Sequence, residues 1–253
     1  MRSQSSVAGS LRRDRVAITS CIVLITALAW AYLVHLNGQM TANMGMAMTA
    51  SWGVPDVFFT FLMWAVMMVG MMSPTAAPVL FLFSGMQVRQ PGGLQSYAVP
   101  LFALGYTTVW VGFSALAALA QWALHEAALL SPGMAASSSR VAGAILIAAG
   151  IYQLTPAKGA CLRQCQSPLG FLLSRWRDGE WGALQMGLRH GLYCLGCCWA
   201  LMTVLFVVGV MNLVWVAALT GFILLEKFGG AGPIIARLGG AALIAFGVLI
   251  VVR

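Results

Sequence analysis

The segment VFFTFLMWAVMMVGMMSPTAAPVLFLFSG (57–85) decides the fold class, because its 29 residues include no charged side chain. About 20 apolar residues in a helix are enough to cross the hydrocarbon core of a membrane. Further apolar segments cover residues 16–36, 97–124, 140–156, 190–210, 212–227 and 234–252. The sequence therefore predicts an all-α, multi-pass membrane protein with about seven transmembrane helices.

The helix count depends on how the chain passes Met211 and Asn212, which alone separate two of these segments. If both segments formed one bent element, the count would fall to six. A single helix over 190–227 would be about 57 Å long, nearly twice the thickness of the hydrocarbon core. We therefore expect a tight turn at Asn212 and two separate helices.

Composition excludes most other classes of protein. Apolar residues make up 60% of the 253 residues and charged residues only 8%, against about 25% in soluble domains. So few charges cannot solvate the surface of a soluble enzyme. The net charge of +8 does not indicate nucleic-acid binding, because the basic residues fall between the apolar segments. We expect membrane lipid as a partner and no nucleic acid.

The basic residues predict the orientation, since cytoplasmic loops carry an excess of Lys and Arg. With the N-terminus inside, twelve lie on the inner side: Arg2, Arg12, Arg13, Arg15, Arg89, Lys158, Arg163, Arg175, Arg177, Arg189, Lys227 and Arg237. Only Arg140 and Arg253 lie outside. We expect a basic cytoplasmic segment (1–15), a single membrane domain (16–253) and location in the bacterial inner membrane.

Two parts of this topology need a choice between alternatives. The 21 apolar residues at 16–36 exceed the usual 7–15 of a signal peptide and lack a clean small-residue cleavage site, so we expect a retained helix. Residues 157–189 are expected to form a cytoplasmic loop. Within it, Pro168 to Trp181 fits either a short helix on the membrane surface or an ordinary basic loop.

Cysteine and histidine form the clearest candidate site. Cys161 and Cys165 follow the fourth apolar segment, and His190, Cys194, Cys197 and Cys198 begin the fifth. Residues 190, 194 and 197 differ by four and three, so they share one helix face. Thiolates and imidazole are ligands for Cu(I), zinc or an iron–sulfur cluster. We expect these groups to converge on one soft metal ion, although close helix packing would also explain small, polarizable residues. Cys21 stands alone in the first segment and is expected to serve packing.

Methionines form a second pattern. Met63, Met67 and Met71 repeat every four residues, with Met68 and Met72 beside them. Neutral thioethers can pass Cu(I) through a membrane, where an ionised ligand would be costly. Packing of an irregular core is the alternative. Pro74 and Pro78 are expected to kink this helix, and Glu226 with Lys227 to form a local charge pair.

The first outer loop holds more methionines, at Met40, Met44, Met46 and Met48. Packing of a core does not explain apolar residues in a loop that is exposed to water. Met44, Met46 and Met48 with His35 and His125 are candidates for an outer metal site, although a histidine at a helix end is also a common interfacial residue.

Five strings carry a family resemblance: MMVGMMSPTAAP (67–78), GYTTVW (105–110), YQLTPAKGACLRQCQSPLGF (152–171), HGLYCLGCCWALM (190–202) and GVMNLVW (209–215). Over residues 57–250 the chain resembles an uncharacterised bacterial family of predicted metal-binding integral membrane proteins. The resemblance implies a metal-binding membrane protein and no particular reaction.

The leading functional hypothesis is copper handling. Outer methionines would collect Cu(I), the methionine stripe would pass it inward, and the cysteines and His190 would hold it. We find no nucleotide-binding motif to drive transport, so movement would be passive, or delivery would go to a copper-dependent enzyme. One alternative is a membrane thiol oxidoreductase using Cys161/Cys165 and Cys197/Cys198 against quinone. Another is a structural subunit bound to other membrane subunits.

Overall fold

The computed structural model describes residues 4–42, 52–88, 97–127, 129 and 136–252, and it confirms the all-α class. No strand occurs within these ranges. The helices are α1 (Gln4–Ala42), α2 (Val54–Val88), α3 (Ala98–Glu126), α4 (Ser139–Gln153), α5 (Pro156–Gln166), α6 (Pro168–Arg175), α7 (Gly179–Thr203), α8 (Leu205–Val208), α9 (Leu213–Phe228) and α10 (Gly232–Val252).

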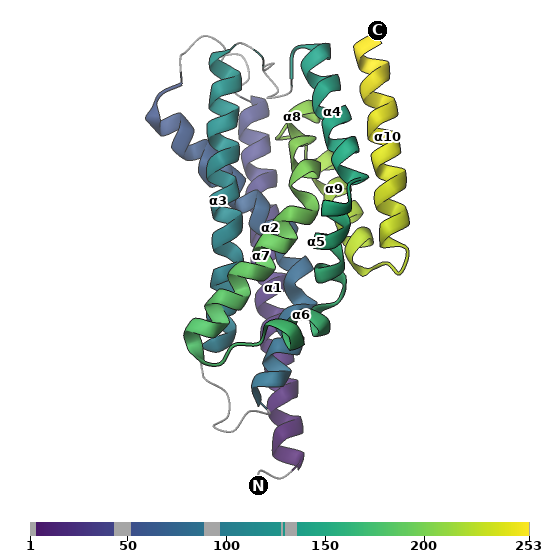
Figure 1. Cartoon of the computed structure of the whole chain (residues 1–253). Helices are drawn as coiled ribbons and strands as arrows, with labels where there is room; N and C mark the ends of the chain where they lie inside the picture. The colour runs from purple at the N-terminus through teal and green to yellow at the C-terminus, as the bar shows by residue number, and fades with distance from the viewer. Residues whose placement is uncertain (1–3, 43–51, 89–96, 128, 130–135, 253) are drawn as a thin grey trace.

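Five of the described helices are long and apolar enough to cross a membrane: α1, α2, α3, the helical stretch Gly179–Val208, and α10. The pair α4 and α5 makes a sixth if this element, bent by 63°, is one span. The segment predicted at 212–227 forms α9, which has only 16 residues and falls short of this criterion. The expected count of seven is therefore not confirmed. The two described ends of the chain lie at opposite ends of the bundle (Figure 1).

The predicted turn between the fifth and sixth segments is present. The chain leaves α7 at Thr203, passes through the short α8, and turns at Gly209, whose φ of 94° is one that L side chains rarely adopt. The amide of Asn212 donates to the Gly209 carbonyl at 3.0 Å, and α9 begins at Leu213. The two segments are thus separate helices.

Residues 157–189 are largely helical, which corrects the expectation of a loop. They comprise most of α5, all of α6 and the first turns of α7. Of the two alternatives for Pro168–Trp181, the short helix is present as α6, which lies in the half of the molecule that holds the N-terminus (Figure 1). Thr155 caps α5 by accepting the Lys158 amide at 3.3 Å, and Pro156 occupies its first turn. Proline fits there because that position needs no amide donor.

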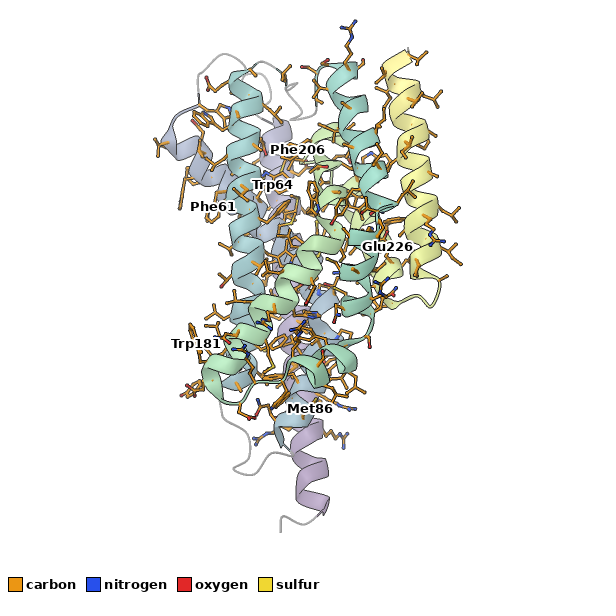
Figure 2. All side chains as sticks on the ribbon, viewed as in Figure 1. Phe61, Trp64, Met86, Trp181, Phe206 and Glu226 are labelled. Atoms are coloured by element: carbon orange, nitrogen blue, oxygen red, sulfur yellow. The ribbon has the colours of Figure 1, made fainter. Side chains whose placement is uncertain are left out.

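Helix α3 packs closely against α7. A Cβ added at Gly187 would collide with the carbonyl oxygen of Phe102, and one at Gly105 would collide with that of Leu184. Glycine is therefore required for the two backbones to approach this closely. Trp64 and Phe206 fill the interior with ring centroids 5.2 Å apart, while Trp181 lies on the outside (Figure 2).

The exposed surface is strongly apolar, as expected for a protein in contact with lipid. On α1, Val23, Leu24 and Leu28 are each about 60% exposed. Cys21 is also exposed on this helix, so the expectation that it packs inside is wrong. Membrane association follows from these helices, because soluble monomers rarely expose such large continuous apolar patches.

Candidate metal centre

The cysteine-bearing face of α7 points into the bundle. His190, Cys194, Cys197 and Cys198 are each at most 3% exposed. The spacing of four and three residues therefore places them on one buried face. The thiols of Cys197 and Cys198 both donate to the Cys194 carbonyl, at 3.1 and 2.9 Å. These bonds hold the two sulfurs close to the helix turn that carries Cys194.

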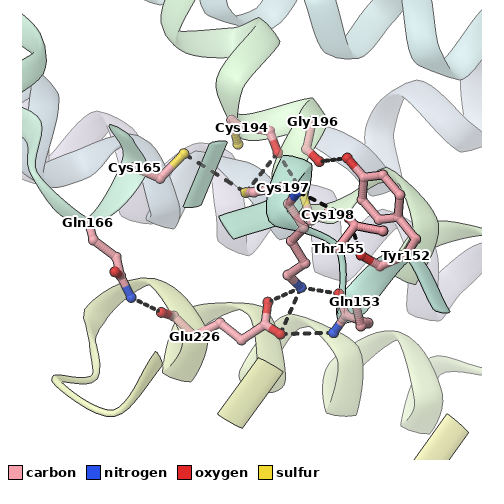
Figure 3. A network of polar contacts seen from close by, with 11 residues as sticks. Tyr152, Gln153, Thr155, Cys165, Gln166, Cys194, Gly196, Cys197, Cys198 and Glu226 are labelled. Carbon is pink, nitrogen blue, oxygen red and sulfur yellow. Dashed lines mark hydrogen bonds and ion pairs between the residues drawn. The ribbon is translucent and has the colours of Figure 1, made fainter. Parts of the chain in front are cut away.

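Helix α5 brings the second cysteine pair to this face. The Sγ atoms of Cys165 and Cys197 lie 3.9 Å apart, and Figure 3 shows the contact. Cys161 packs on Gly196, where an added Cβ would lie 2.7 Å from the Cys161 sulfur. The bend after α4 is what turns these two cysteines toward α7.

Cys194 has the most polar surroundings of the cysteines. The ammonium of Lys227 lies 2.9 Å from its sulfur, and the hydroxyl of Tyr106 lies 3.0 Å away. The hydroxyl of Thr75 is 4.0 Å from the same sulfur and accepts a hydrogen bond from Lys227 at 3.2 Å. An ammonium and a phenol directed at one sulfur favour the thiolate, which is the form that binds metals.

Sequence reasoning did not assign Lys227, Tyr106 or Thr75 to the site. A lysine within an apolar segment was a usable signal, because buried charges in membranes are costly and tend to be functional. We expected Lys227 to pair with its neighbour Glu226. That expectation is wrong, because consecutive residues of a helix point in directions about 100° apart.

Glu226 instead forms a second network with α4 and α5. The Lys158 ammonium contacts both carboxylate oxygens at 2.8 Å, and each side chain is only 1% exposed. Gln153 donates to Glu226 at 2.9 Å and also accepts from Lys158 (Figure 3). Gln166 donates to the Glu226 carbonyl at 2.7 Å. This network ties α9 to the bent element beside the cysteines.

The side chain of His190 packs among aromatic rings. Its ring centroid is 5.0 Å from that of Phe171, 6.0 Å from that of Tyr106 and 6.2 Å from that of Phe102. The Nδ1 atom is buried and has no hydrogen-bond partner among the described residues. A buried, unpaired imidazole nitrogen has a lone pair or a proton available to a ligand.

The predicted methionine stripe is buried. Met63, Met67 and Met71 are at most 4% exposed, as are Met68 and Met72 beside them. Their helix α2 is continuous and contains both Pro74 and Pro78. It also supplies Thr75 to the Cys194 network. The stripe and the cysteine cluster therefore belong to one core.

The candidate outer site lies mostly outside the described residues, which include no part of Met44, Met46 or Met48. His35 is exposed and lies 3.0 Å from the Gln39 side chain through its Nε2 atom. The ring of His125 stacks on Trp52 at 4.6 Å.

In the part of the chain that the structure describes, no three His, Cys, Asp or Glu side chains are arranged to hold a metal ion together. The convergence of all six predicted ligands on one ion is therefore not evident. What the geometry offers is a close pair of sulfur atoms, those of Cys165 and Cys197, and a buried Cys194 sulfur with a cation and hydroxyl groups beside it. Such a set can hold a soft ion of low coordination number or exchange electrons between thiols.

Comparison with known protein families identifies a relationship over most of the chain. The family PpoB2, described as copper chaperone, matches residues 61–250. That region contains all six of the candidate cysteine and histidine ligands and the methionine stripe. No curated protein and no solved structure matches the chain.

Proposed function

The chain belongs to the PpoB2 family of copper chaperones, and on that premise we propose that it binds Cu(I) at Cys194 with the neighbouring sulfurs of Cys165 and Cys197. Copper handling agrees with the donor set, because soft thiolates and thioethers favour Cu(I). Copper is here the cargo of the protein.

The observation that carries the proposal is the environment of the Cys194 sulfur. It is buried, and it receives contacts from Lys227 and Tyr106. Lys227 and Tyr106 stabilise a thiolate before metal arrives. Cys197 adds a second sulfur next to Cys165. Cu(I) is satisfied by few, soft ligands, so this arrangement fits it better than an ion that needs four converging groups.

We extend the proposal to the transfer of Cu(I), which would use the remaining methionine, cysteine and histidine ligands. Met63, Met67 and Met71 would supply weak thioether sites leading to the cysteines, so that the ion never enters hydrocarbon unligated. Cys161, Cys198 and His190 would take part as the ion exchanges between ligands. The recipient would be a copper-dependent enzyme or another membrane subunit.

Copper binding is tested on the full chain, purified in mild detergent under anaerobic, reducing conditions. Elemental analysis should find stoichiometric copper in the wild type and in the control Cys21→Ser, whose cysteine is exposed on α1. Cys194→Ser should lose it. X-ray absorption at the copper edge should show sulfur neighbours. Equal copper in Cys194→Ser and wild type would overturn the assignment.

Transfer is tested separately from binding. Met67→Leu together with Met71→Leu should leave copper at the cysteines but slow its arrival from outside in proteoliposomes. Leucine keeps the volume and removes the thioether, so packing changes little. Unchanged uptake in this double variant would remove the methionines from the path.

One observation favours a second candidate, a thiol oxidoreductase. The 3.9 Å separation of the Cys165 and Cys197 sulfurs lets these two thiols form a disulfide after a small movement. Two protons and two electrons would pass to a quinone, giving a quinol. This pairing differs from the Cys161/Cys165 and Cys197/Cys198 pairs expected from spacing. Mass spectrometry after thiol trapping distinguishes the functions, because a disulfide that forms with oxidised quinone supports the enzyme.

A further inference from the structure

Both ends of α5 are attached to a single residue of α9. At the N-terminal end, the Lys158 ammonium contacts the Glu226 carboxylate at 2.8 Å. At the C-terminal end, the Gln166 side chain donates to the Glu226 backbone carbonyl at 2.7 Å (Figure 3). The last four carbonyls of a helix have no partner within it, and Glu226 is third from the end of α9. Gln166 therefore satisfies a carbonyl that its own helix leaves unpaired.

The contact of Gln166 depends on a glycine at the start of α10. A Cβ added at Gly232 would collide with the Gln166 Nε2 atom and with the Glu226 carbonyl oxygen, the two atoms that the hydrogen bond joins. No side chain larger than hydrogen fits there without displacing one of them. The junction between α9 and α10 thus leaves room for the Gln166 amide.

The two cysteines of α5 lie between these attachments. Cys161 packs on Gly196, and the sulfurs of Cys165 and Cys197 lie 3.9 Å apart. Cys165 directly precedes Gln166 in the chain, so a shift of the Gln166 backbone moves Cys165 with it. Helix α5 has only 11 residues and follows a 63° bend, and so short a helix is not stable alone. Its place against α7 must therefore be set by contacts with its neighbours.

We propose that Gln166 is a positioning residue for Cys165, which it holds beside Cys197 by anchoring the end of α5 to the backbone of α9. The inference rests on the proposed function, in which these sulfurs are copper ligands. Groups that orient metal ligands from outside matter for affinity, and their loss typically weakens metal binding 10–100-fold. Gln166 does not itself bind the ion; it restricts where the Cys165 sulfur can go.

The position of Cys165 is measured without metal. The full chain in mild detergent is treated with diamide, which takes two electrons and two protons from a pair of thiols. Mass spectrometry then follows the formation of the Cys165–Cys197 disulfide over time. Gln166→Met keeps the length of the side chain and removes its donor. Gly232→Ala leaves Gln166 unaltered but puts a methyl group against both bonded atoms.

Each variant has a matched control. Gln164→Met makes the same change on the same helix, beside Cys165, at a residue that is not among the described contacts of Glu226. Gly230→Ala lies in the same junction, where an added Cβ meets nothing within 4 Å. The free energy of unfolding is measured for all four variants, so that loss of position is separated from loss of stability.

Gln166→Met and Gly232→Ala should slow disulfide formation by about tenfold or more, because the rate, like metal affinity, depends on how often the two sulfurs are within reach. Both controls should keep the wild-type rate. A purely structural glutamine would lower the free energy of unfolding and leave the rate in the folded protein unchanged, which overturns the inference. Equal slowing in Gln164→Met also overturns it, as does a wild type that forms no such disulfide. Should Gly232→Ala not fold, Gln166→Met decides the result.

Metal binding is measured apart from the disulfide. Titration with Ag(I), a stand-in for Cu(I), is followed by the ultraviolet absorption of silver–thiolate bonds, and Gln166→Met should bind 10–100-fold more weakly than the wild type. If the wild type and Cys194→Ser bind Ag(I) equally, the proposed function fails, while the disulfide rates still decide whether Gln166 positions Cys165. If silver binding requires Cys194 but Gln166→Met keeps the wild-type affinity, copper binding stands and the inference is overturned.

Discussion

The buried pair Lys158–Glu226 gives the sharpest stability prediction. Both side chains are 1% exposed, and the ammonium contacts both carboxylate oxygens at 2.8 Å. Removing one partner strands the other charge in a medium of low dielectric constant. Such a loss costs about 3–5 kcal/mol, a large share of the roughly 5–15 kcal/mol that stabilises a typical protein. Lys158→Met and Glu226→Gln should each destabilise the protein by this amount.

The double variant separates the charge effect from packing. Removing both charges leaves no stranded ion, so Lys158→Met with Glu226→Gln should recover most of the loss. The free energy of unfolding is measured by titration with a denaturing detergent in mixed micelles, for the wild type, both single variants and the double variant. A loss below about 1 kcal/mol in both single variants would refute the reasoning, because it would mean that the pair is in contact with water.

Two further predictions concern α3 and the helix it packs on. Gly187→Ala places a methyl group against the Phe102 carbonyl, so it should lower the free energy of unfolding by about 1–3 kcal/mol through overpacking. The control Gly112→Ala has nothing within 4 Å of the new Cβ and should leave stability unchanged. Equal unfolding curves for the two variants would contradict the close approach of α3 and α7. Tyr106→Phe removes the hydroxyl bonded to Cys194 and to the Met72 carbonyl and should cost about 1–2 kcal/mol, measured in the same titration. An unchanged stability would show that neither bond is formed.

Hydrophobic segments predicted the helices well because a membrane helix is recognised by its own composition. The turn at Asn212 was predictable for the same reason, since the combined length is too great for one span. The break at Thr155–Pro156 was harder to recognise. Proline fits the first turn of a helix as readily as it ends one, so residues 157–189 were assigned to a loop although they are largely helical.

The candidate site was predictable only in part. Residues on one helix, such as His190 and Cys194, follow from spacing along that helix. The approach of Cys165 was a correct guess about which helices meet. Contacts of Lys227 could not be read from its neighbours in sequence, because they depend on how α9 is rotated against α2 and α7. That rotation is set by packing across the whole bundle.

The polar cluster around Cys194 draws on helices far apart in the chain: Thr75 from α2, Tyr106 from α3 and Lys227 from α9. During synthesis the ribosome releases these segments in order, and Lys227 is the last of them. A nascent chain therefore carries its thiols before it carries their counter-charge. The set of contacts at the Cys194 sulfur is therefore complete only after α9 has inserted, so the proposed binding of metal there would have to follow that step.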